Sequence, residues 1–423
     1  MSNIYLPKIS KTIKDIVKIP GSKSIANRVL ILAAIAQGKS IIYNVPDSAH
    51  DVYLMIKALK DLGIKITKKN NTYIIVGCNG NIPVKKAKIF CGNSGTTFRF
   101  LTAILAIQNG QYILTGNKRM QQRPIEDLVI ALSSIGAQIS YLKKNFYPPI
   151  QINQFIDNAS NRVNINGKIS SQFLSSILMA SSILKRKIDI CVINELISKP
   201  YINITTILLK KFGAIVECLN NSYIITPSNL TAVKYTIEPD ASSASYFLAI
   251  GAIAGDITIK DLGTTSIQGD KNFALILKKM GAIVDYSENT IRVKHQPLKS
   301  IEIDMQDMPD VAMTLAIVAL FAKGTTIIKG ISSWRVKETD RQEAMYNELK
   351  KLGATIEITD NSISITPPKI IKQNAIINTY DDHRMAMAFS LIAVGGISVT
   401  IKDYQCVEKT FVNYFTIFNK ICY

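Results

Sequence analysis

The chain has 423 residues, of which 47% are hydrophobic, and it carries a formal net charge of +19. That length exceeds what one hydrophobic core ordinarily serves, so we expect two or more domains. The lysines are dispersed, without a long basic run, an RNA-binding signature or zinc-finger spacing. This pattern argues against nucleic acid as a partner and favours small polyanions.

Six cysteines are scattered without a CxxC pair and only three histidines occur, so neither a disulfide framework nor a zinc site is indicated. Residues 1–14 lack the apolar core of a signal peptide, and the longest apolar runs, such as 311–322, are shorter than a membrane span. We therefore expect a cytoplasmic protein with reduced thiols and no membrane partner.

Six apolar helices are expected, each beginning where a cluster of Gly, Ser, Asn or Asp runs into an apolar stretch. In chain order the openings are residues 20–24, 91–97, 169–172, 239–245, 308–310 and 381–385. A helix N-terminus carries unsatisfied N–H groups and a partial positive charge. Several such ends directed at one place would bind phosphates or carboxylates.

The pattern after each opening repeats along the chain. A β-rich segment follows the first helix, and a second helix then ends near a glycine and leads into two short strands. Five glycines mark these ends at intervals of roughly 70 residues, which indicates a repeated supersecondary unit: Gly63, Gly136, Gly213, Gly281 and Gly353. The sixth copy runs out of chain, and we expect residues 4–19, which alternate like a strand, to supply its missing strands.

The repeats predict an α/β fold of two domains, each built from three βαβαββ units. Residues 20–235 would form one continuous, inserted domain with repeats one to three. Residues 1–19 and 236–423 would form the other, with repeats four to six and both termini. We expect the active site in a cleft between the domains, where ligands often bind.

Two of the first three openings combine basic side chains with small residues. Lys23 would stand at the positive end of its helix, and Ser24 and Arg28, four residues apart, share a face. Gly95 permits close backbone approach, and Arg123 directly precedes a proline that we expect at N1 of the next helix. The alternative is ordinary capping with solvated lysine and arginine.

Neutral hydrogen-bonding residues mark the third opening and the helix start that follows it. Ser170, Ser171 and Gln172 stand at one helix start, and Ser198 and Tyr201 at the next. Such side chains are most often caps. Asp240, at the fourth opening, is assigned to capping as well.

The segment 334–341 is the densest in charge, and within it Glu338 and Arg341 would share a helix face if the segment has already entered its helix. A carboxylate held among cations in a cleft can transfer protons. The alternative is a salt-bridged, solvated helix start. Asp310 and the pair His383 and Arg384 face the same choice, since an Asp in a first turn is a common cap. Taken together, the openings favour an enzyme for anionic substrates.

These motifs, in this order over nearly the whole chain, resemble the 5-enolpyruvylshikimate-3-phosphate (EPSP) synthase family, also named 3-phosphoshikimate 1-carboxyvinyltransferase. The motifs are PGSKSIANR, GNSGTTFR, RMQQRPI, SSQF, SKPY, PDASSASYF, PDVAMT, WRVKETDR, DDHRMAM and KTF. The resemblance implies a two-domain, six-unit fold, an inside-out α/β barrel.

The resemblance also implies the reaction. The enolpyruvyl group of phosphoenolpyruvate would pass to the 5-hydroxyl of shikimate 3-phosphate with release of phosphate, on the route to chorismate and the aromatic amino acids. By motif position, the phosphoenolpyruvate ligands would be Lys23, Gly95, Arg123, Gln172, Arg341, Arg384 and Lys409. The shikimate 3-phosphate ligands would be Lys23, Ser24, Arg28, Ser170, Ser171, Gln172, Ser198, Tyr201, Asp310 and Lys337.

Three of these residues receive chemical roles. Asp310 would take the 5-hydroxyl proton, Glu338 would protonate the methylene carbon and later remove a proton, and Lys23 would stabilise charge on the departing phosphate. The resemblance implies no metal or organic cofactor, since positioned cations can stabilise the phosphate charge, and we expect a monomer.

Three positions depart from the family pattern. Ser333 stands where asparagine is usual, Phe100 where proline is usual, and Ser94 where alanine is common. Two alternative functions remain. One is the sister enzyme that uses UDP-N-acetylglucosamine, although residues 116–123 lack its reactive cysteine. The other is a protein that binds anions or nucleic acid without catalysis.

Overall fold

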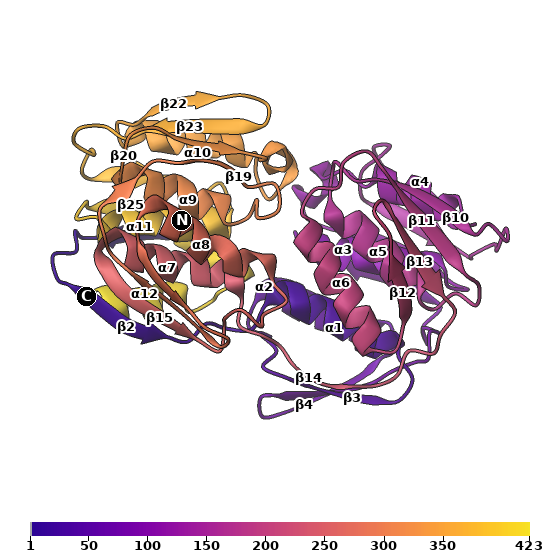
Figure 1. The fold of residues 1–423 in the computed structure, drawn as a ribbon. Helices are drawn as coiled ribbons and strands as arrows, with labels where there is room; N and C mark the ends of the chain where they lie inside the picture. The colour runs from indigo at the N-terminus through magenta and orange to yellow at the C-terminus, as the bar shows by residue number, and fades with distance from the viewer. Residues whose placement is uncertain (1) are drawn as a thin grey trace. The chain divides into compact units, whose positions relative to one another are not determined.

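The computed structural model describes residues 2–423 as alternating helices and short strands (Figure 1). The chain divides into two compact units. Unit 1 comprises Met1–Pro20 and Glu238–Tyr423, and unit 2 comprises Gly21–Ile237. The boundaries between the units lie within two residues of the domain boundaries expected after residues 19 and 235. The first strands and the last helix both belong to unit 1 (Figure 1).

Unit 2 contains three four-stranded sheets with two helices each. The first has strand order β14-β3-β5-β4, and its elements are β3 (Lys39–Tyr43), β4 (Lys65–Lys69), β5 (Thr72–Val76), β14 (Lys234–Thr236), α1 (Lys23–Ile35) and α2 (His50–Asp61). The second has order β6-β7-β9-β8, and its elements are β6 (Lys86–Phe90), β7 (Gln111–Thr115), β8 (Gln138–Tyr141), β9 (Ile150–Asn153), α3 (Gly95–Ala106) and α4 (Glu126–Ser133). The third has order β10-β11-β13-β12, and its elements are β10 (Arg162–Asn166), β11 (Ile188–Ile193), β12 (Ile215–Cys218), β13 (Ser222–Thr226), α5 (Ser171–Ser181) and α6 (Lys199–Lys211).

Unit 1 repeats this plan. Its first sheet has order β16-β17-β15-β2, with β2 (Ile13–Val17), β15 (Gly255–Lys260), β16 (Ile283–Tyr286), β17 (Thr290–Lys294), α7 (Ala241–Ala254) and α8 (Phe273–Met280). The next has order β19-β21-β23-β22, with β19 (Glu302–Asp304), β21 (Thr326–Lys329), β22 (Thr355–Ile358), β23 (Ser362–Thr366), α9 (Ala312–Val318) and α10 (Arg341–Lys351). The last has order β1-β25-β24, with β1 (Asn3–Leu6), β24 (Ala375–Ile377), β25 (Val399–Lys402), α11 (His383–Val394) and α12 (Tyr414–Cys422).

Shorter elements connect these. A small sheet joins β18 (Leu298–Lys299) to β20 (Ala322–Lys323), and five 3₁₀ turns occur at η1 (Met120–Gln122), η2 (Gly269–Asn272), η3 (Ala319–Phe321), η4 (Ser332–Val336) and η5 (Tyr404–Lys409). Within the described residues, no helix combines the length and apolar character needed to cross a membrane.

The N-terminal segment only partly fills the place expected for it. β1 pairs antiparallel with β25 and so completes the sixth sheet, as expected. β2 instead pairs parallel with β15 of the fourth sheet, and β14 takes the equivalent place beside β3 in the first. At both domain boundaries, therefore, the strand that directly precedes an opening helix in the chain, β2 before α1 and β14 before α7, belongs to a sheet of the unit that the chain is leaving.

The six expected openings all begin helices, which start at Lys23, Gly95, Ser171, Ala241, Ala312 and His383. These helices are apolar around most of their circumference and are buried accordingly. In α3 and α11 every residue is buried, and in α7 all but the last are. Because the sides of such helices are packed against neighbours, only their ends can meet a ligand.

The five glycines that close the second helices adopt φ angles from +88° to +114°. This left-handed conformation is the usual helix C-terminal one, and only glycine adopts it readily. The prediction of the repeat from these glycines is therefore confirmed.

Candidate active site

The start of α1 is left open to an anion. Ser22 occupies the N-cap position, yet its hydroxyl makes no capping hydrogen bond, is buried and has no partner within residues 2–423. The first N–H groups of the helix therefore keep their free donors. Beside them, the Lys23 ammonium lies 3.0 Å from the buried carboxylate of Asp51, which positions it.

Arg28, one turn further along α1, lies at the centre of a buried polar network. Its Nε donates to the Thr205 hydroxyl at 2.7 Å, and its Nη2 to Ser175 at 3.0 Å and the Tyr201 carbonyl at 3.3 Å. Burial lowers the pKa of Arg28 to about 10. The guanidinium is 1% exposed, and no carboxylate in the described part of the chain pairs with it.

A second cluster forms where α3 and α5 begin. Gln172 accepts a hydrogen bond from Arg99 at 2.7 Å. A Cβ at Gly95 would lie 2.8 Å from Arg123 and 3.0 Å from Arg99, so any larger residue would push the two guanidinium groups away. Asn27 of α1 donates to Thr96 of α3 at 2.6 Å, which joins the starts of the two helices.

Arg123 is buried without a counter-ion. It is 4% exposed, its Nη1 contacts only the main-chain and side-chain oxygens of Asn93, at 3.2 and 3.4 Å, and its Nε has no partner among residues 2–423. A buried charge without a partner is costly, so this arrangement is typical of a site that awaits an anion.

The expectation that Pro124 occupies N1 of the second helix is wrong. The 3₁₀ turn η1 ends at Gln122, just before Arg123, and α4 begins only at Glu126 after the non-helical Ile125. Arg123 is thus held by the turn, whose Met120 carbonyl accepts its N–H, rather than by a helix start.

The neutral residues divide into caps and strained positions. Ser170 caps α5 by accepting from the Gln172 N–H at 3.3 Å, and Ser171 is the first residue of that helix. Ser198 precedes α6 in the left-handed region, with φ of +55°, and makes no capping bond. Strain of this kind concentrates at functional positions. Tyr201 lies in the first turn of α6, where its carbonyl binds Arg28.

In unit 1, Asp310 is surrounded by three cations. Its Oδ1 accepts from Arg341 at 2.8 Å and lies 3.5 Å from the Lys337 ammonium, while its Oδ2 accepts from Arg384 at 2.9 Å. Arg384 also contacts the Tyr246 hydroxyl at 3.3 Å. The carboxylate precedes α9 and caps nothing, so the capping alternative for Asp310 is excluded.

Arg341 connects three carboxylates. Besides Asp310, it binds Asp382 at 2.7 Å and Glu338 at 2.9 Å, and it is 1% exposed. Lys409 lies 4.0 Å from Glu338. The condition for Glu338 and Arg341 to share a helix face is not met, because α10 begins at Arg341 and the pair forms across its cap, Asp340.

The charges around Asp310 set its ionisation. Burial opposes ionisation, yet Arg384, Lys337 and Arg341 together hold the pKa of Asp310 well below its usual value. Burial also lowers the pKa of Lys337, against the stabilising charge of Asp310. In this structure Asp310 is therefore a fully ionised but weak base.

Two further residues shape this site. Trp334 is fully buried and donates from its indole N–H to the Pro309 carbonyl at 2.7 Å, which joins the segment carrying Lys337 to the one carrying Asp310. Asp382 caps α11 by accepting from the Arg384 N–H at 2.9 Å, and the same carboxylate binds Arg341.

Of the three residues that depart from the family pattern, Ser94 and Phe100 have structural roles, and none is evident for Ser333. Ser94 caps α3 through the Thr97 N–H. The Phe100 ring lies under Arg28, with 5.1 Å from guanidinium carbon to ring centroid, a cation–π contact that a proline would not provide. Ser333 is buried in η4. Asp240 caps α7 by accepting from the Ser243 N–H at 3.0 Å, as expected.

The structure brings the predicted residues together in two groups, one within each unit. Unit 1 gathers Asp310, Lys337, Glu338, Arg341, Arg384 and Lys409. Unit 2 gathers Lys23, Ser24, Gly95, Arg123, Ser170, Ser171, Gln172, Ser198 and Tyr201 around the starts of α1, α3, α5 and α6, with Arg28 among them. Sequence reasoning missed Asp51, Ser175, Thr205 and Asp382, which position these residues. Only Asp382 lies within a motif that could have revealed it.

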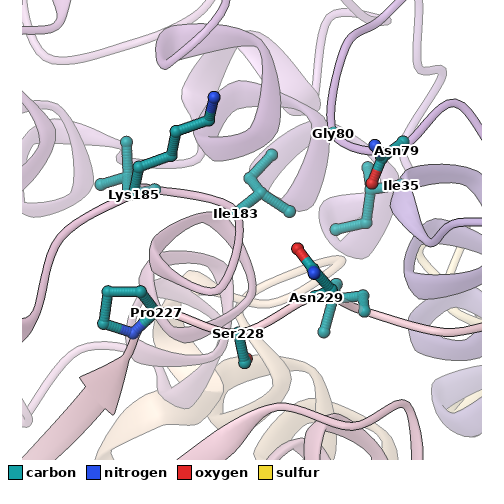
Figure 2. A pocket seen from close by; sticks show the side chains of 10 residues that line it. Ile35, Asn79, Gly80, Ile183, Lys185, Pro227, Ser228 and Asn229 are labelled. Atoms are coloured by element: carbon teal, nitrogen blue, oxygen red, sulfur yellow. The ribbon is translucent and has the colours of Figure 1, made fainter.

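A cavity elsewhere in unit 2 contains none of these residues. It has a volume of about 460 Å³ and lies beyond the C-terminal end of α1, where Ile35, Asn79, Ile183 and Asn229 line it (Figure 2). Among residues 2–423, no group of three or more His, Cys, Asp or Glu side chains is placed to bind a metal ion.

Known proteins match this chain over nearly its whole length. The EPSP synthase (3-phosphoshikimate 1-carboxyvinyltransferase) family model matches residues 7–418. A curated 3-phosphoshikimate 1-carboxyvinyltransferase from Buchnera aphidicola subsp. Baizongia pistaciae is 47% identical over 418 residues, 96% of each chain. One from Paraburkholderia phymatum is 45% identical over 411 residues, 94% of each chain.

Solved structures agree with these relatives. An EPSP synthase from Acinetobacter baumannii superposes with a TM-score of 0.82 at 25% identity, covering 99% of this chain and 98% of the other. The enolpyruvyl transferase NikO from Streptomyces tendae gives a TM-score of 0.77 at 14% identity, with coverage of 99% and 97%. That second likeness concerns the two-domain α/β fold alone.

Proposed function

This chain belongs to the EPSP synthase family, and we propose that it performs the family's transfer with an active site whose two halves lie on the two units. The reaction moves the enolpyruvyl group of phosphoenolpyruvate to the 5-hydroxyl of shikimate 3-phosphate and releases phosphate. It is a transferase reaction of the shikimate pathway, which leads to the aromatic amino acids.

The observation that carries the divided site is the pair of buried arginines without counter-ions in unit 2. Arg28 and Arg123 are 1% and 4% exposed, and neither has an ion-pair partner in the described chain. Guanidinium groups bind phosphate and carboxylate through two parallel hydrogen bonds. Arg28 would bind the phosphate of shikimate 3-phosphate, and Arg123 would bind phosphoenolpyruvate.

The other residues of unit 2 complete the two subsites. Ser24, Ser170, Ser171, Ser198 and Tyr201 would hold shikimate 3-phosphate by hydrogen bonds, and Gly95 would line the phosphoenolpyruvate pocket. Gln172 would contact both substrates. Lys23, at the open end of α1, would contact both and stabilise the departing phosphate, because helix end and ammonium both favour negative charge there.

Unit 1 would supply the remaining cations and both proton-transfer groups. Arg341, Arg384 and Lys409 would hold phosphoenolpyruvate, and Lys337 and Asp310 would hold shikimate 3-phosphate. Asp310 would take the proton from the 5-hydroxyl as its oxygen attacks carbon 2 of phosphoenolpyruvate. Glu338 would protonate carbon 3, which gives a tetrahedral ketal.

Elimination would complete the reaction. Glu338 would remove a proton from the same methyl carbon, the double bond would re-form, and the bond to the phosphate oxygen would break. Glu338 thus recovers the proton that it gave in the addition. The departing phosphate, whose charge Lys23 would stabilise, would take up the proton that Asp310 received from the 5-hydroxyl. These steps require only positioned acids, bases and cations.

The low pKa of Asp310 gives substrate binding a direct role. Arg341 and Arg384 bind Asp310 at 2.8 and 2.9 Å in this structure. If they turn toward the anionic groups of phosphoenolpyruvate, Asp310 loses two stabilising charges while remaining mostly shielded from water, with 19% of its side chain exposed. Its pKa then rises, so the carboxylate becomes a competent base only when the second substrate is present.

The test is phosphate release from phosphoenolpyruvate with either shikimate 3-phosphate or UDP-N-acetylglucosamine as acceptor. We expect turnover with shikimate 3-phosphate alone. Turnover with the sugar nucleotide would assign the chain to the sister reaction, and no turnover with either would support binding without catalysis.

We also propose that the enzyme works as a monomer in the cytoplasm. All six cysteines lack disulfide partners, which suits a reducing compartment. Sedimentation at micromolar concentration would test the oligomeric state, and a dimer would contradict it.

A further inference from the structure

Unit 1 carries a cationic hollow, away from the residues assigned to the reaction. Its volume is about 440 Å³, and it lies where α10 ends beside the edge strand β24. Seven residues line it, three of them lysines and none acidic: Lys351, Lys372, Asn374, Ala375, Ile376, Asn378 and Lys402.

Three acceptors at this hollow are already occupied. Glu348 lies beneath it with a fully buried side chain and accepts from Lys351 at 2.6 Å, the Asn378 N–H at 3.0 Å and the Tyr380 hydroxyl at 2.7 Å. The Ile376 carbonyl accepts from Lys351 at 3.1 Å. The side-chain oxygen of Asn374 accepts from the Ser398 hydroxyl at 2.6 Å.

The donors, by contrast, remain available. The ammonium groups of Lys372 and Lys402 make no ion pair or hydrogen bond within residues 2–423. Lys351 has three N–H donors, of which Glu348 and Ile376 take two. The Asn374 amide nitrogen is available because its oxygen is the atom that is engaged.

We propose that this hollow binds a small molecule with two linked phosphate groups. A site that offers donors and positive charge, with no carboxylate in its lining, selects an anion. Because Glu348 already neutralises Lys351, the uncompensated charges around the hollow of about 440 Å³ are those of Lys372 and Lys402, and a ligand with two linked anionic groups can offer one group to each. Inorganic pyrophosphate and nucleoside diphosphates both carry that group.

The hollow is joined to the proposed active site by short structural steps. α10 runs from Arg341, which binds Asp310, to Lys351 at the hollow. Glu348, under the hollow, holds Tyr380, which lies two residues before Asp382, the partner of Arg341. A ligand in the hollow would therefore contact Lys351, the same lysine that neutralises Glu348.

Isothermal titration calorimetry with metal-free inorganic pyrophosphate tests the proposal. Anions also bind at the proposed active site, so the wild-type chain should show two classes of site. The double variant Lys372→Gln/Lys402→Gln should lose one class, with affinity reduced at least tenfold, and should retain the other. Its turnover of phosphoenolpyruvate should equal that of the wild type, which separates this test from the catalytic proposal.

The matched control is Lys350→Gln/Lys369→Gln, which removes the same charge from two nearby lysines that do not line the hollow. We expect this control to bind like the wild type. Equal isotherms for wild type and the hollow variant would overturn the proposal, as would an equal loss in the control, since that would indicate diffuse charge. ADP in place of pyrophosphate identifies the source. If ADP binds more tightly than pyrophosphate and the hollow variant loses this binding, the ligand is a nucleotide. If ADP binds more weakly, the ligand is pyrophosphate itself.

Discussion

Replacement of Asp310 by asparagine should separate catalysis from binding. The change keeps the size of the side chain but removes the charge that binds Arg341 at 2.8 Å, Arg384 at 2.9 Å and Lys337 at 3.5 Å. Loss of a general base typically costs about 10² to 10⁴ in turnover. That corresponds to about 3–5 kcal/mol in the barrier at 1.36 kcal/mol for each factor of ten.

Binding of phosphoenolpyruvate should move in the opposite direction. On the proposed mechanism the substrate competes with Asp310 for two arginines in the wild type, and a hydrogen bond to a charged group contributes about 1.5–3 kcal/mol. Release of even one such bond would lower the KM for phosphoenolpyruvate by about tenfold. Since chemistry becomes slow in the variant, KM then approaches the dissociation constant.

Steady-state phosphate release at saturating shikimate 3-phosphate measures both quantities. Asp307→Asn, the same change at an exposed carboxylate three residues earlier, is the control and should behave like the wild type. Turnover within tenfold of the wild type would refute the role of Asp310 as base. A raised KM with unchanged turnover would indicate that Asp310 only binds substrate.

Three further predictions follow from the site. Glu338→Gln should fold normally but lose at least a hundredfold in turnover. Glu343→Gln, an exposed change in the first turn of α10, is the control and should keep wild-type turnover. A fully active Glu338→Gln variant would exclude Glu338 from the mechanism. Arg28→Lys should raise the KM for shikimate 3-phosphate and lower the free energy of unfolding by about 1–3 kcal/mol, because Thr205 loses its donor; unchanged urea denaturation would contradict this. Burial and the charge of Asp310 raise the pKa of Asp270 to about 6 from 3.8. Its carboxyl therefore favours folding below pH 4, and about 3 kcal/mol of stability is lost as pH rises through 6. Asp270→Asn should lack this loss in denaturation measured at pH 4 and 7, and parallel curves for both proteins would refute it.

The repeat was predictable because its signals are local. Small or polar residues before an apolar run mark a helix start, and a glycine such as Gly281 marks an end, since only glycine readily adopts a φ of +114° there. These rules act within a few residues, and all six opening helices begin where they indicate. The pairing of β2 with β15 in the fourth sheet and of β14 with β3 in the first was not predictable. The pairing between β2 and β15, for example, depends on contacts across more than two hundred residues.

The site was predictable where a motif carries its own partners. Glu338 and Arg341 are three residues apart and do form an ion pair, although across a helix cap rather than along a face. Asp51, by contrast, contacts Lys23 from a different helix, and nothing near either residue indicates the pair. The depressed pKa of Asp310 likewise depends on cations from two distant segments of chain, which only the fold brings together.

The most direct test of a divided active site is a crystal structure of the complex with shikimate 3-phosphate and a non-reacting phosphoenolpyruvate analogue. The account predicts that Arg123 of unit 2 and Arg384 of unit 1 both lie within hydrogen-bonding distance of the same analogue molecule. It also predicts that Arg384 has left Asp310, to which it is bound at 2.9 Å without ligand. An analogue held by one unit alone, with the ion pairs of Asp310 intact, would contradict it.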